Sequence, residues 1–120
     1  MVELAKRRCT ACEGGLPALK RRELAPLRRA LDRPWEVVGG KKLRRKLPFR
    51  DFATALRFAN EVGALAEKEW HHPELAVGWG HVVIEIWTHA VGGLTVNDFI
   101  LAAKIDRLVH ARARRPRRKA

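Results

Sequence analysis

Apolar residues recur every three or four positions in three stretches of the chain, the spacing that places them on one face of an α-helix. The first stretch, residues 17–31, carries four leucines among basic residues, and Pro26 is expected to interrupt or kink this helix. The second follows Asp51, whose carboxylate suits a helix N-cap, and Pro73 is expected to stop it within a few residues. The third, residues 95–111, predicts the last helix.

Strand-like segments lie between the predicted helices. Residues 35–38 and 41–49 flank Gly39-Gly40, and a Gly-Gly pair supplies the positive φ angles that a tight hairpin turn requires. Residues 75–79 and 81–89 form a second pair of such segments. In the last of them, alternate positions give the strand one uniformly apolar face, made of Val82, Ile84 and Ile86.

The order of these elements indicates the fold class. Helices and hairpins are grouped and do not alternate one by one as in a parallel sheet, so the sequence predicts an α+β domain with one antiparallel sheet. Thr95, followed three residues later by Asp98, resembles a capping box at the start of the last helix.

The chain of 120 residues is long enough for one domain with a modest core. We expect a flexible N-terminal arm at residues 1–15, a domain at 16–110 and a basic disordered tail at 111–120. No apolar run approaches the ~18 residues of a membrane helix, and the N-terminus lacks the apolar core of a signal peptide. We therefore expect a cytoplasmic protein with no membrane partner.

The net charge of +12 is distributed unevenly. Residues 1–50 carry 15 Lys and Arg against 5 Asp and Glu, whereas residues 51–106 carry 3 against 8. The last fourteen residues add seven basic groups and no acidic ones. This basic excess suggests an acidic partner that contacts the chain outside residues 51–106. Nucleic acid is the weaker candidate, because no aromatic residues are interleaved with the basic tail to stack on bases.

The arm contains both cysteines of the chain, Cys9 and Cys12. Two cysteines are too few for a disulfide-stapled secreted fold. The pair could donate half of a zinc site across an oligomer, form a redox pair, or be two incidental thiols.

Four of the five histidines lie within residues 71–89, and three of them, His71, His72 and His89, are candidate site residues. His71 and His72 precede Pro73, Glu67 lies four residues before His71, and His89 follows eighteen residues after it. The pair could simply end a helix, where positive charge suits the helix dipole. A zinc site lacks a nearby CxxC or HxxxH partner, and a Cys–His nucleophilic pair would need a cysteine from the loose arm.

General acid–base chemistry is the functional interpretation that these residue types favour. Imidazole titrates near neutrality and can take and return a proton, while a nearby carboxylate fixes its tautomer. If the helix persists, Glu67 and His71 share one of its faces. Two or three such groups could transfer protons on a planar heterocycle, but the spacing of the residues does not identify that heterocycle.

The motif resembles the pterin-4a-carbinolamine dehydratase family. The similarity spans about Pro17 to Leu108 and includes the "RDF" start of the central helix. The matching positions, in register along the chain, are Glu67, His71, His72, Pro73, Trp79, His89 and Asp98.

The resemblance implies a four-stranded antiparallel sheet with helices on one face, in a homodimer or homotetramer. It implies loss of water from 4a-hydroxytetrahydropterin to give quinonoid dihydropterin, with neither metal nor cofactor. His71 and His89 would transfer protons at the 4a-hydroxyl and the ring nitrogen, and His72 would bind and orient the pterin. Supporting or substrate-binding roles would fall to Glu67, Pro73, Trp79, Thr88 and Asp98. Asp98 could instead only cap the last helix, and Trp79 could belong to the core.

Some features depart from the usual pattern of these enzymes. Ala90 follows the third histidine where many dehydratases carry an acid, and Trp87 occupies a strand position that is usually small or polar. The N-terminal arm is extra, and residues 9–19 together with residues 78–105 resemble the branch that includes dehydratase-like Rubisco assembly factors. That resemblance implies an alternative function as a non-catalytic chaperone, with an acidic protein such as Rubisco as partner.

Overall fold

A computed structural model describes residues 3–9 and 16–114 of the protein. This part of the chain forms three α-helices, four β-strands and two short 3₁₀ helices. In chain order they are η1 (Leu4–Lys6), α1 (Arg21–Arg29), β1 (Glu36–Val38), β2 (Lys42–Pro48), α2 (Phe52–Glu69), β3 (Glu74–Gly78), β4 (His81–Ile86), η2 (His89–Val91) and α3 (Val96–Ala113).

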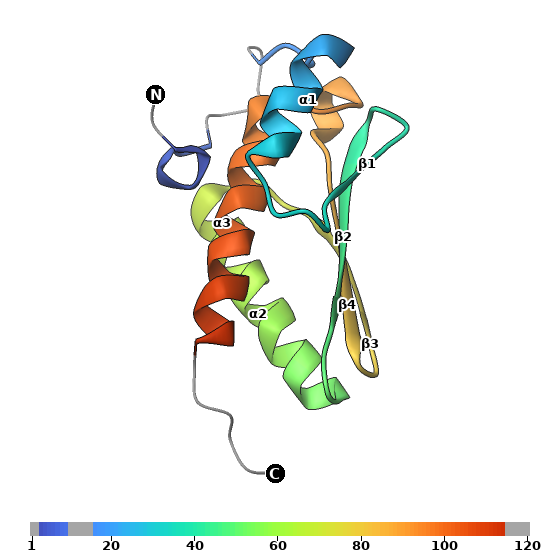
Figure 1. Ribbon diagram of the computed structural model, residues 1–120, viewed down its shortest axis with the longest axis vertical. Helices are drawn as coiled ribbons and strands as arrows, with labels where there is room; N and C mark the ends of the chain where they lie inside the picture. The colour runs from blue at the N-terminus through green and yellow to red at the C-terminus, as the bar shows by residue number, and fades with distance from the viewer. Residues whose placement is uncertain (1–2, 10–15, 115–120) are drawn as a thin grey trace.

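The strands form one antiparallel sheet in the order β1-β2-β4-β3. The two central strands, β2 and β4, pair with Leu43 opposite Ile86 and Leu47 opposite Val82. Figure 1 shows the three α-helices on one side of the strands, and residues of α2 and α3 share a core with the sheet. The predicted α+β fold, a four-stranded antiparallel sheet with helices on one face, is confirmed.

Local sequence signals position the elements as expected. Gly39 and Gly40 both have positive φ angles, 58° and 70°, in the turn of the first hairpin. The Asp51 carboxylate accepts the Thr54 N–H at 2.8 Å and so caps α2. At the start of α3, Thr95 and Asp98 form the predicted capping box.

Alternate residues of the central strands face the helices. On β4 they are the completely buried Val82, Ile84 and Ile86, which confirms the predicted apolar strand face. Each such side chain contributes about 1.5–3 kcal/mol when it leaves water. On β2 the corresponding position between Leu43 and Leu47 is Arg45, whose side chain is buried as well.

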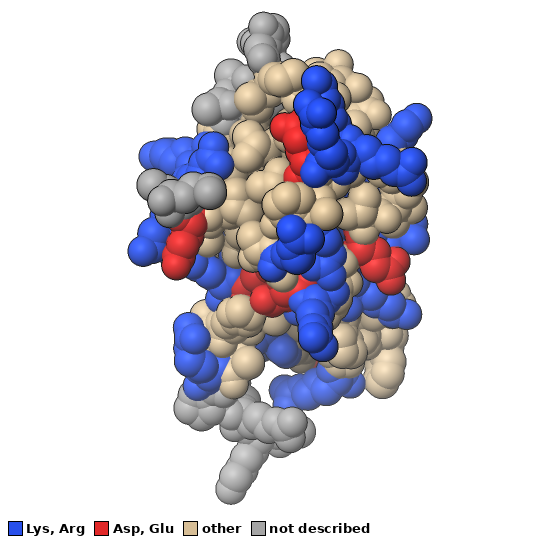
Figure 2. Space-filling model, turned by 45° about the horizontal axis from the view of Figure 1, so that its top comes forward, with Lys and Arg blue, Asp and Glu red and all other residues tan. Residues whose placement is uncertain are grey.

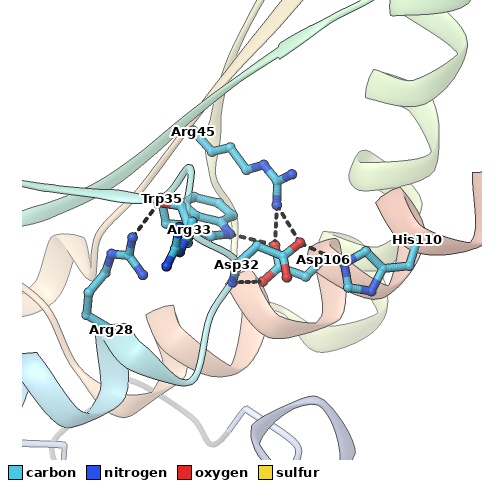
Figure 3. A network of polar contacts seen from close by, with 7 residues as sticks. All are labelled: Arg28, Asp32, Arg33, Trp35, Arg45, Asp106 and His110. Carbon is cyan, nitrogen blue, oxygen red and sulfur yellow. Dashed lines mark hydrogen bonds and ion pairs between the residues drawn. The ribbon is translucent and has the colours of Figure 1, made fainter. Parts of the chain in front are cut away.

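The Arg45 guanidinium is paired inside the core (Figure 3). Its Nη1 donates to Asp106 Oδ1 at 2.7 Å and to Asp32 Oδ2 at 2.9 Å. Asp106 also accepts hydrogen bonds from the Trp35 indole at 2.6 Å and from the Asp32 backbone N–H at 2.9 Å. Burial raises the pKa of Asp106, because desolvation disfavours the ionised carboxyl. This cluster joins β2, α3 and the segment after α1.

Helix α1 differs from the expectation at Pro26. The helix runs without interruption from Arg21 to Arg29 with Pro26 inside it, so the predicted interruption is wrong. Proline removes the N–H that would bond to the Arg22 carbonyl, but this part of α1 is exposed and water can satisfy that oxygen.

The ends of the domain also differ from their expected boundaries. Residues of η1 pack against α3, and Lys104 Nζ donates to the Ala5 carbonyl at 3.0 Å, so this part of the arm is placed on the domain. Helix α3 continues to Ala113, and residues 111–113 are therefore helical and not a disordered tail. Cys12 and residues 115–120 lie outside the described residues. Within the described ranges, no helix combines the length and hydrophobicity that a membrane span requires.

Candidate functional site

The site begins where α2 ends. Trp70 adopts a left-handed conformation with φ 53° and ψ 43°, which costs a residue other than glycine about 1–2 kcal/mol. The backbone N–H groups of Trp70 and His71 bond back to the last turn of α2, at 3.3 Å to the Glu67 carbonyl and 3.2 Å to the Ala66 carbonyl. This cap stops the helix before the histidine pair.

The early end of α2 changes the partner of Glu67. Its carboxylate lies 2.5 Å from His72 Nε2, and both side chains are exposed. The expected pairing of Glu67 with His71 on one helix face required the helix to continue, so that expectation is wrong. The Trp70 ring packs edge-on against His72, with ring centroids 5.0 Å apart.

His71 turns toward α3 and pairs with Asp98. His71 Nε2 lies 2.6 Å from Asp98 Oδ1, and the exposed fractions of the two side chains are 5% and 0%. The other oxygen, Asp98 Oδ2, accepts the Thr95 N–H at 2.8 Å and the Thr88 hydroxyl at 2.9 Å. A carboxylate oxygen accepts hydrogen bonds, so His71 Nε2 is the donor in this contact.

Two threonines fix the position of this carboxylate. Thr88 lies between β4 and η2, and Thr95 caps α3. Their hydroxyls are 2.8 Å apart and both residues are buried. Asp98 therefore caps α3 and also holds His71, and the two interpretations offered by the sequence do not exclude each other.

His89 lies at the start of η2, directly after Thr88, and is exposed. Its ring packs on Trp87, with centroids 4.4 Å apart and an interplanar angle of 30°. Lys42 Nζ lies 4.6 Å from the centroid of the same indole. The unusual residue Trp87 thus restricts the orientation of His89.

The remaining predicted residues lie around β3. Pro73 is half-buried and immediately precedes this strand. Trp79 lies in the turn between β3 and β4 and is 74% exposed, so it is not part of the core of this chain. Among the described residues, no group of three or more His, Cys, Asp or Glu side chains is arranged to hold a metal ion.

Comparison with known proteins identifies the family to which this arrangement belongs. The profile described as "Pterin 4 alpha carbinolamine dehydratase" matches residues 17–108. The chain belongs to this family. A relative from Rubrobacter xylanophilus, provisionally named a pterin-4-alpha-carbinolamine dehydratase, is 51% identical over 90% of this chain and all of its own length. A relative from Rickettsia bellii with the same provisional name is 48% identical over 88% of this chain and 93% of its own.

A solved structure shows the same fold in this dehydratase family. The crystal structure of a transcriptional coactivator/pterin dehydratase from Brucella melitensis superimposes with a TM-score of 0.70 at 33% identity. The match covers 77% of this chain and 98% of that one.

Sequence reasoning missed the left-handed cap at Trp70 and the contact between the Thr88 and Thr95 hydroxyls. The nearby Pro73 signals a helix end but not the conformation of that end. The predicted capping box did identify Thr95 and Asp98 as partners, and it was the available signal for this part of the site.

Proposed function

We propose that the protein dehydrates 4a-hydroxytetrahydropterin to quinonoid dihydropterin by histidine acid–base catalysis. The observation that carries the proposal is the buried contact between His71 and Asp98, whose carboxylate is held by two threonines. A histidine that transfers protons must keep one orientation and one tautomer, and this arrangement supplies both. Membership of the dehydratase family supports the same reaction class.

The proposed reaction requires two proton transfers. The bond between C4a and the hydroxyl oxygen breaks, and a proton delivered to that oxygen lets it leave as water. A proton lost from the ring nitrogen supplies the electron pair for the new carbon–nitrogen double bond. One histidine gives a proton and another takes one, so the reaction is balanced without a cofactor or metal.

The residues divide between chemistry and binding in this proposal. His71 and His89 transfer the protons, and Thr88 and Asp98 hold His71. His72, oriented by Glu67, binds the pterin together with Trp79 and Pro73. The exposure of His72 and Trp79 supports a binding role, because an approaching ligand can reach both side chains.

The three histidines can be separated by single substitutions. We expect His71→Ala and His89→Ala each to lower kcat by ~10²–10⁴, because each removes a group that transfers a proton. His72→Ala should mainly raise KM. The measurement is the ultraviolet change as synthetic 4a-hydroxytetrahydropterin is dehydrated. Wild-type kcat in both His71→Ala and His89→Ala, with folding confirmed by circular dichroism, would contradict the acid–base assignment.

We also propose a cytoplasmic homodimer or homotetramer. The sheet supports the oligomer, because β1 and β3 are edge strands of the described sheet and a strand edge can pair with a second copy.

A second candidate function is protein assembly, with an acidic protein such as Rubisco as partner. The net charge of +12 favours it, since a nearly neutral pterin does not require such an excess. Figure 2 shows Lys and Arg side chains over much of one face, with fewer Asp and Glu among them. A folded protein that binds an acidic partner at low salt but does not accelerate dehydration would support this candidate.

A further inference from the structure

We propose that the cavity between η1, α2 and α3 is a binding site for a phosphate monoester. The cavity has a volume of about 340 Å³, which falls at the lower end of the range for small-molecule sites. It is lined by Ala5, Arg8, Leu65, Lys68, Glu69, Lys104 and Arg107. Figure 1 shows η1 beside α3, so the arm closes one side of this space.

The lining has four cationic side chains and one carboxylate. Glu69 is compensated within the protein, because its carboxylate lies 3.8 Å from Lys104 Nζ and accepts the Cys9 N–H at 3.0 Å. Lys104 is also anchored to the Ala5 carbonyl. Arg107 Nη2 lies 3.2 Å from Glu3 Oε2, so this guanidinium is paired with a carboxylate of the arm. These contacts join the arm to both helices and form the walls of the cavity.

Arg8 and Lys68 remain as uncommitted charges. Neither forms an ion pair or hydrogen bond in the described part of the chain. One comes from the arm and the other from the last turn of α2, so they approach the cavity from different elements. Two cations suit a dianion, and the guanidinium group in particular matches the geometry of phosphate oxygens.

The apolar part of the lining suggests the rest of the ligand. Leu65 and Ala5 present hydrocarbon beside the cations, and both are partly buried against the core. A phosphate monoester with a small apolar group would place its oxygens on Arg8 and Lys68 and that group on Leu65.

The proposal can be tested by titrating inorganic phosphate and phenyl phosphate into ¹⁵N-labelled full-length protein at constant ionic strength. We expect saturable amide shifts in residues 3–9 and 65–69, with tighter binding of phenyl phosphate. Arg8→Gln combined with Lys68→Gln should weaken binding by about tenfold, since two exposed charge contacts are lost. The matched control, Lys41→Gln with Lys46→Gln, removes two exposed charges from the β1–β2 hairpin and should bind as the wild type does.

Three results would overturn the proposal. Equal weakening in both double variants would show that only the net charge attracts the anion. Equal binding of malonate and phosphate would contradict the assignment to phosphate, and phenyl phosphate no tighter than inorganic phosphate would contradict the apolar contact. The readout is binding and not turnover, so it does not depend on the proposed dehydration.

Discussion

Replacing Asp98 with asparagine separates the two tasks of this carboxylate. The amide has the same shape, and its oxygen can still accept the hydrogen bonds of Thr88 and Thr95. Its NH₂ group then faces His71 Nε2, where both atoms would present hydrogens at a separation of 2.6 Å. His71 can avoid this conflict by moving its proton to Nδ1, which is the wrong tautomer for the proposed reaction.

The magnitude follows from the hydrogen bonds of Asp98. A hydrogen bond to a charged group contributes about 1.5–3 kcal/mol to stability and a neutral one about 0.5–1.5 kcal/mol. Two neutral donors, Thr88 and Thr95, lose a charged acceptor, so the free energy of unfolding should fall by about 2 kcal/mol. The free energy of unfolding of small domains is about 5–15 kcal/mol, so the variant should remain folded. Its kcat should fall by ~10²–10⁴, with little change in KM.

Urea unfolding and the ultraviolet dehydration assay measure the two effects separately. Asp51→Asn is a matched control, because the Asp51 carboxylate also binds a threonine at the start of a helix. Asp51 lies at the opposite end of the 18-residue helix α2 from His71, a length of about 27 Å. The control should keep wild-type kcat. A folded Asp98→Asn variant with wild-type kcat would refute the reasoning that Asp98 holds His71 for catalysis.

Two further predictions concern pH and metal. Desolvation raises the pKa of Asp106 above its ordinary value of 3.8, so between these two pKa values the folded state binds more protons than the unfolded state. The free energy of unfolding should therefore fall as the pH rises from about 3.8 through the pKa of the folded state. Asp106→Asn should remove this decline. It should also lower the free energy of unfolding at neutral pH by about 3 kcal/mol, because Arg45 loses a buried partner. An unchanged pH dependence of the urea unfolding of this variant would contradict the prediction. Chelator treatment should leave dehydration unchanged, whereas a loss restored by zinc would favour a metal site.

Much of the fold could be predicted because local signals and hydrophobic periodicity agreed. Val82, Ile84 and Ile86 alternate along one strand, and the Gly39-Gly40 pair fits only a few turn types. Arg45 could not be placed in the same way. Its burial depends on Asp32 and Asp106, residues 13 and 61 positions away in the sequence, and no local pattern shows that contact.

The contacts of the candidate site residues could be predicted only in part. The capping pattern predicted the contact between Thr95 and Asp98, whereas the histidine motif did not predict which carboxylate each histidine contacts. Which carboxylate holds which histidine depends on a single left-handed residue, Trp70, which ends α2 and turns His71 away from Glu67. A tryptophan gives no sequence signal for that conformation, because glycine and asparagine are the residues that usually adopt it.

The most direct test of the proposed function is a dehydration assay with the wild-type protein. Synthetic 4a-hydroxytetrahydropterin loses water spontaneously, and the ultraviolet change records this rate with and without the protein. We predict an acceleration well above the spontaneous rate between about pH 6 and about pH 8, where histidines can exchange protons. A folded protein that gives no acceleration anywhere in this range would contradict the proposal that the family's reaction is carried out by this chain.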